Sequence, residues 1–165
     1  MTPDDVVEQE GPPAHLDSSP SAKRLASLLQ TVPSRLANIP DDETAQSPAP
    51  GRWSKKQILG HLIDSAGNNH QRWVRAQVAP RLEFPGYPQE SWVAVQSYAT
   101  ESWPDLVNLW LLLNRHLLHI IRNVPESSLS RPCVIGAHDA IPLSAVIEGY
   151  LTHLQHHLAQ ILETP

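Results

Sequence analysis

The chain has 165 residues, which is the size of one ordinary domain with a core large enough to fold alone. Its 12 basic and 17 acidic side chains give a formal net charge of −5, which disfavours nucleic acids and anionic membrane surfaces as partners. No stretch approaches the roughly 18 apolar residues of a membrane span, and the acidic N-terminus lacks the features of a secretory signal. We therefore expect a soluble, cytoplasmic protein, and its single cysteine, Cys133, fits a reducing compartment.

In the N-terminal third of the chain, the sequence predicts a tail, a helix and a loop. Residues 1–18 are dominated by Glu, Asp, Pro and Gly, which indicates a disordered tail before a single helical domain at 19–165. A first helix is expected to begin with Ser19 as its cap and Pro20 in its first turn, and to break at Pro33. A long loop then leads to residue 53.

A second helix is predicted from about residue 55 to residue 77, because Ser54 and Gln57 form a capping-box pattern. At 100° per residue, the apolar side chains of this segment gather on one arc of the helix, and His61 lies at its edge. The same edge carries a polar stripe that is placed to line a pocket, made of Ser65, Asn68 and Arg72.

Two more helices follow an irregular, aromatic segment at residues 80–98, which is expected to pack over one end of the bundle. The third helix begins after Ser102 and ends at Asn123, and it is apolar on most of its surface. It is therefore either the most buried helix or one that also contacts a partner subunit. The fourth helix is predicted from Leu143 to the C-terminus.

Three histidines are the main lead to function. His153 and His157 lie one helical turn apart near the core side of the fourth helix, which lets both reach one divalent metal ion. If His61 faces them across the bundle, the three form a metal centre with open coordination positions. His156 points further from the core, so it either faces solvent or supports a metal-binding histidine from outside the centre. The four-residue spacing alone is weak evidence, because a chain of this length with nine histidines is expected to contain roughly 0.5 such pairs by chance. His61 taken alone fits a hydrogen-bonded histidine at the edge of the core equally well.

Further polar residues near this centre are candidates for catalysis or ligand binding. Tyr150 and Gln160 flank the pair and could orient a ligand or hold a water molecule. Asp64 could accept a proton from a histidine ring, or it is a solvated helix carboxylate. The candidate cofactor-binding residues are Ser65, Asn68 and Arg72. Arg72 or Arg75 could bind a carboxylate of a thiol cofactor, although an exposed arginine without an anion is the commoner case.

Two segments resemble the signature segments of the DinB/YfiT-like superfamily: residues 53–65, WSKKQILGHLIDS, and residues 153–161, HLQHHLAQI. The resemblance covers roughly residues 19–163. It implies an all-α, up-down-down-up four-helix bundle with a long irregular loop between helices two and three, often as a homodimer. Carried over by position, it implies a divalent metal held by His61, His153 and His157, the trio that the helical faces also select.

The resemblance implies two chemistries for a small-molecule substrate. Such families include proteins assigned as metal-dependent hydrolases and thiol S-transferases that use bacillithiol, mycothiol or glutathione. A metal at three histidines would activate water or a low-molecular-weight thiol, and no protein nucleophile is needed. Zinc or nickel is expected, with iron or manganese as alternatives. The competing hypothesis is a non-catalytic bundle that binds a metal or ligand as a sensor or interaction module.

Overall fold

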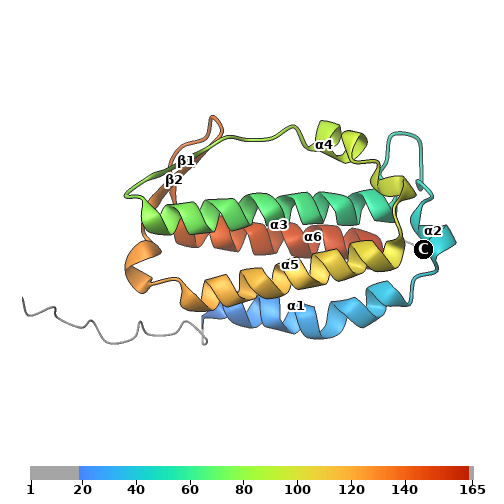
Figure 1. The fold of residues 1–165 in the computed structure, drawn as a ribbon, viewed down its shortest axis with the longest axis horizontal. Helices are drawn as coiled ribbons and strands as arrows, with labels where there is room; N and C mark the ends of the chain where they lie inside the picture. Colours follow the sequence, from blue (N-terminus) through green and yellow to red (C-terminus); the bar gives the residue numbers. More distant parts are fainter. Residues whose placement is uncertain (1–18, 164–165) are drawn as a thin grey trace, which may run out of the picture.

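The computed structural model describes residues 19–163, and its architecture is a bundle of four long helices (Figure 1). The tail predicted at residues 1–18 lies outside the described residues. The long helices are α1 (Pro20–Ala37), α3 (Lys55–Val78), α5 (Trp103–Asn123) and α6 (Leu143–Glu163). The connections contain short elements: α2 (Asp41–Thr44), β1 (Leu82–Phe84), α4 (Gln89–Val95), η2 (Tyr98–Thr100), η3 (Glu126–Ser128), β2 (Pro132–Ile135) and β3 (Ile141–Pro142).

The predicted up-down-down-up topology is confirmed. Helices α1 and α6 run in one direction, whereas α3 and α5 both run in the other (Figure 1). Helix α3 packs against α5 and α6, and α1 packs against the same two helices. Their inward faces form one continuous core, which includes Trp73, Trp110 and Leu154. Within residues 19–163, no helix combines the length and the sustained apolar character that a bilayer crossing requires.

Local capping residues set the helix starts as the sequence predicts. The Ser19 hydroxyl accepts a hydrogen bond from the backbone of Ala22, and Ser54 forms the full capping box with Gln57. The predicted break at Pro33 is wrong, because α1 continues through it to Ala37. A proline removes one backbone hydrogen bond, but the tertiary packing of the apolar face on either side keeps this helix continuous.

The segment between α3 and α5 returns along the length of the bundle. Because these two helices are parallel, the chain leaving the end of α3 must cross to the opposite end before α5 begins (Figure 1). The expectation that residues 80–98 cover one end of the bundle is therefore wrong. Along the way β1, α4 and η2 all pack on α3. Helix α3 consequently has neighbours on several sides, and residues from most of its circumference are buried.

Two hydrogen bonds attach this crossover segment to α3. The Tyr98 hydroxyl and the Gln96 side-chain amide each donate to Oδ1 of Asp64, at 2.8 Å. The Tyr98 ring lies directly on Gly60, where no side chain could be accommodated in the present arrangement. The glycine and the carboxylate together determine where the crossover reaches the start of α5.

A small sheet at the end of the bundle was not foreseen from the sequence. Strand β1 pairs in parallel with β2, and β2 pairs antiparallel with β3. These strands are too short for a two-residue alternation of apolar side chains to be recognised. Beside the sheet, Arg131 donates to the backbone carbonyls of Ala76, Gln77 and Ala79, which caps the C-terminus of α3.

Helix α5 is less buried than its apolar sequence suggests. Leu109 and Leu112 on its outer face are 47% and 62% exposed. Helix α3, not α5, has the most extensive buried surface of the four, so the expectation that α5 is the most buried helix is wrong. A contact of α5 with a partner subunit stays a prediction.

We predict that Gly60→Ala destabilises the fold by about 1–3 kcal/mol, because the added methyl group would overlap the Tyr98 ring. Urea unfolding followed by circular dichroism measures the change. Gly67→Ala on the same helix is the matched control, since its Cβ would meet no atom within 4 Å. The control is expected to gain about 0.5–1 kcal/mol from helix propensity. Equal stabilities of the two variants would contradict the packing role of Gly60.

Candidate metal centre

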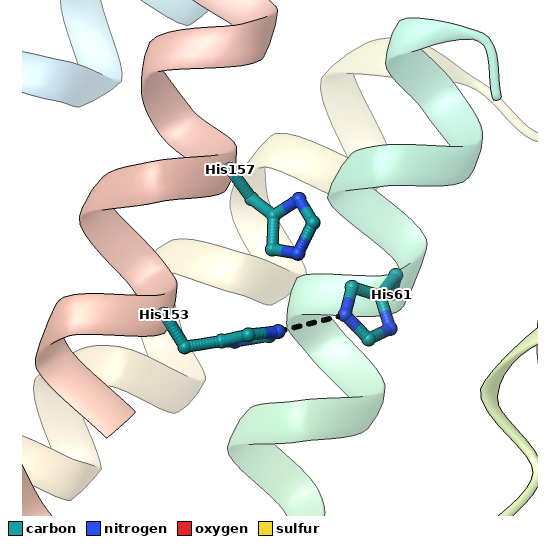
Figure 2. Close-up of side chains that lie close together, drawn as sticks. All are labelled: His61, His153 and His157. Atoms are coloured by element: carbon teal, nitrogen blue, oxygen red, sulfur yellow. Dashed lines mark hydrogen bonds between the residues drawn. The ribbon is translucent and has the colours of Figure 1, made fainter. Parts of the chain in front are cut away.

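Three imidazole rings converge between α3 and α6 (Figure 2). His61 comes from α3, and His153 and His157 come from successive turns of α6. The Nε2 atoms of His61 and His153 are 2.9 Å apart, and one potential ligand nitrogen from each ring lies within 4.8 Å of the other two. The structure thus brings together the three residues that the sequence singles out, although 92 positions separate His61 from His153.

Burial keeps these rings neutral. His61 is fully buried, and its burial, followed by the neighbouring imidazoles, lowers its pKa to about 4. Burial and the adjacent rings also lower the pKa of His153 to about 4, and burial lowers the pKa of His157. Neutral imidazole nitrogens retain the lone pairs that a metal ion needs, so the donor set fits a divalent cation.

Hydrogen bonds outside the trio orient two of the rings. Nδ1 of His157 lies 2.8 Å from the Gln160 side-chain oxygen. This oxygen can only accept a hydrogen bond, so Nδ1 carries the proton and donates. This leaves Nε2 of His157 free to face the centre. The Gln160 amide nitrogen in turn contacts Nε2 of His156 at 3.1 Å. On the other side, Nδ1 of His153 lies 3.5 Å from the Ser65 hydroxyl.

The His61 ring is enclosed further by Trp53, whose ring centroid is 5.1 Å away. Nδ1 of His61 is buried without a hydrogen-bond partner among the described residues. A buried polar atom without a partner is unfavourable for folding, so its presence needs an explanation. His61 is thus a fully buried histidine whose Nε2 contacts His153 and whose Nδ1 lacks a partner in the described part of the chain, an arrangement that a metal ligand can have.

Two predicted catalytic candidates have other partners. The Asp64 carboxylate accepts its hydrogen bonds from the crossover segment, at Gln96 and Tyr98. The Tyr150 hydroxyl donates to Oδ1 of Asn114 inside the core, where burial raises the pKa of the phenol. Neither side chain has a hydrogen bond to the trio in the described part of the chain. Gln160, the third candidate, contacts His157 and so orients a ring.

The predicted polar stripe is only partly at the site. Ser65 approaches His153, and Arg72 lines a cavity that His153 also reaches. The Asn68 amide instead donates to the backbone carbonyl of Asp64 within α3. Its neighbour Asn69 lines that cavity. Asn69 follows Ser65 by one helical turn and therefore lies on the same face, whereas Asn68 is rotated by 100° from Asn69.

Cavities approach the centre from two directions. One, of about 550 Å³, is lined by the loop before α3 and by His157 and Gln160. The other, of about 400 Å³, is lined by His153 and by residues of α3, the crossover and the β2–β3 turn. Tyr87 of the second cavity lies in the segment at residues 84–92, which the sequence places at the pocket without fixing the direction of its side chains. His138 was missed, because it lies in an irregular segment where no periodicity indicates which way a side chain points.

Comparisons with known proteins agree with this architecture. A protein of Oceanobacillus iheyensis named "Putative metal-dependent hydrolase" is 23% identical over 137 residues, covering 81% of this chain and 79% of its own. The chain is also similar to YfiT of Bacillus subtilis, which is likewise named "Putative metal-dependent hydrolase". The two are 22% identical over 141 residues, and the match covers 82% of this chain and 79% of YfiT.

Solved structures show the same fold. The solved structure of Bacillus subtilis YfiT, described as a probable metal-dependent hydrolase with an unusual four-helix bundle topology, superposes with a TM-score of 0.70 at 20% identity. That alignment covers 99% of this chain and 90% of YfiT. A mycothiol-dependent maleylpyruvate isomerase superposes with a TM-score of 0.67 at 16% identity, covering 89% of this chain and 62% of the isomerase. The family model of the DinB superfamily matches residues 24–161, most of the chain, and this protein therefore belongs to the DinB superfamily.

Proposed function

We propose that this protein is a metal-dependent enzyme in which His61, His153 and His157 hold a divalent ion that activates water or a low-molecular-weight thiol. The observation that carries the proposal is the convergence of three neutral imidazoles, with one nitrogen from each within 4.8 Å of the others. The names of the relatives support metal dependence, and the similarity to a mycothiol-dependent isomerase supports a thiol as the second reactant.

The donor set favours a catalytic role over a structural one. Structural zinc sites usually have four protein ligands, whereas catalytic sites have three and an open position. Among the described residues, the three histidines form the only cluster placed to hold a metal ion, and no cysteine or carboxylate joins them. A bound ion would supply Lewis acidity, which lowers the pKa of water or of a thiol towards neutral pH. Imidazole ligands suit zinc or nickel, and iron or manganese is less favoured.

The surrounding residues have distinct supporting roles in this proposal. Gln160 holds His157 in the tautomer that turns Nε2 to the centre. Trp53 covers His61 and limits access of bulk water from that side. The two cavities give a small substrate and a thiol separate approaches, one at His157 and one at His153. No side chain of the protein has to become a covalent nucleophile.

We predict that tag-free wild-type protein binds about one divalent ion per chain and that His157→Ala lowers the metal affinity at least about tenfold. Elemental analysis after dialysis measures the content, and circular dichroism checks the helices. His156→Ala is the neighbouring control, because His156 is exposed, contacts Gln160 and the His157 ring, and is not one of the three converging histidines. It should keep most of the bound metal. Normal metal content in His157→Ala would refute its assignment as a ligand.

Replacing Gln160 tests the orientation of His157. Gln160→Ala removes the acceptor for Nδ1 and is expected to weaken metal binding by about 10–100-fold, as for other residues that orient ligands. Gln160→Glu retains an acceptor oxygen and is expected to restore most of the affinity. Competition with a chromogenic chelator measures both constants. If the Ala and Glu variants bind equally well, the hydrogen bond has no role at the centre.

Catalysis itself is tested with metal-reconstituted protein. We expect it to hydrolyse activated esters or amides, or to join a thiol to an electrophile, and to lose at least about 100-fold in rate in His61→Ala. A chelator should abolish the same activity, and added metal should restore it. A fully loaded protein that shows neither reaction would favour a metal-binding sensor or interaction module.

A further inference from the structure

We propose that Arg72 binds a carboxylate of the small molecule that reacts at the histidine centre, so that the reacting substrate or thiol is a carboxylic acid. This inference rests on the proposed function, because it assigns a ligand class to the same site. The carboxylate would occupy the 400 Å³ cavity that extends from His153 to Arg72, which we call the Arg72 cavity.

The surroundings of Arg72 leave its charge uncompensated. Its guanidinium lies over the Phe84 ring, 5.4 Å from the centroid, and its Nε is buried without a hydrogen-bond partner among the described residues. None of the ion pairs in residues 19–163 involves it. Burial lowers its pKa, but a guanidinium remains charged at neutral pH. A half-buried cation without an anion is costly, and a bound carboxylate would offset that cost.

The lining of the Arg72 cavity is suited to an anion. No aspartate or glutamate is among the described residues that line it. Groups that can donate hydrogen bonds are present instead, on Tyr87, Gln89 and His138. Its volume of about 400 Å³ also lies within the range that is usual for small-molecule sites. An acid would therefore find a positive charge and hydrogen-bond donors, with no carboxylate on the described wall of the cavity.

The spacing along α3 indicates the length of the ligand. Arg72 follows Ser65 by seven residues, which corresponds to a rise of about 10 Å. The Arg72 guanidinium lies over Phe84 of β1, and Arg72 lines the same cavity as Ser65 and His153. The cavity wall also contains the apolar side chains of Ile135, Ile141 and Val146. They would contact a hydrocarbon chain that joins the carboxylate of the ligand to its reacting atom. A ligand whose carboxylate lies about 8–10 Å from its reacting atom would therefore span the cavity.

A pair of thiols that differ at one end tests this assignment. In cobalt-substituted protein, 6-mercaptohexanoate and 6-mercaptohexanol are titrated, and the absorption band of cobalt–thiolate binding gives each dissociation constant. We expect the acid to bind at least about tenfold more tightly than the alcohol, which is typical of hydrogen bonds to charged groups. Arg72→Gln should remove this preference, and Arg72→Lys should restore only part of it.

Arg75→Gln is the matched control, because Arg75 is exposed on the same helix and donates to Gln71. It should keep the full preference for the acid. Thermal unfolding shows whether each variant remains folded. Equal binding of the two thiols by folded wild-type protein would overturn the inference while leaving the metal centre intact.

A second titration separates failure of this inference from failure of the proposed function. Hexanoate, which has no thiol, is titrated into metal-free wild-type, Arg72→Gln and Arg75→Gln protein by calorimetry. Loss of hexanoate binding in Arg72→Gln alone would support the carboxylate subsite even if cobalt did not bind. Binding that is absent from the wild type, or the same in all three proteins, would contradict it.

Discussion

The contact between α3 and α6 is the constraint on which the rest of this structure depends. Each helix contributes an apolar face to the core, and the polar edges beside those faces meet where the helices pack together. His61 on one edge thereby lies 2.9 Å from His153 on the other, measured between Nε2 atoms. The hydrophobic effect supplies the driving force for this packing, and the histidines are positioned as a consequence.

The same packing determines the chemistry of the histidines. Burial removes water from the rings, which disfavours the protonated forms and keeps the nitrogens available as ligands. It also removes the usual hydrogen-bond partners, so the fold must provide others. Gln160 provides one for His157, whereas Nδ1 of His61 has none in the described part of the chain. The indole nitrogens of Trp73 and Trp110 are also buried without a partner among the described residues, so it is the convergence with His153 and His157 that marks His61 as a candidate ligand.

The direction of the helices has a further consequence for access to the centre. Parallel α3 and α5 require a crossover that runs the length of the bundle, and this crossover contributes Tyr87 to the wall of the Arg72 cavity (Figure 1). Asp64 anchors the same segment through Tyr98. Its position on the helix makes Asp64 a candidate proton acceptor for a histidine, or a solvated carboxylate. The structure instead shows it holding the segment that shapes the cavity.

The sequence by itself determined the helices and the histidine trio, because both depend on local patterns. Capping residues such as Ser54 act within a few positions, and the 100° step of a helix places His61, His153 and His157 on the core edges of their helices. Only the tertiary structure decided the continuity of α1 through Pro33, the small sheet, the partner of Asp64 and the surroundings of Arg72. These features depend on contacts between residues far apart in the chain or on irregular segments, and no local periodicity encodes either.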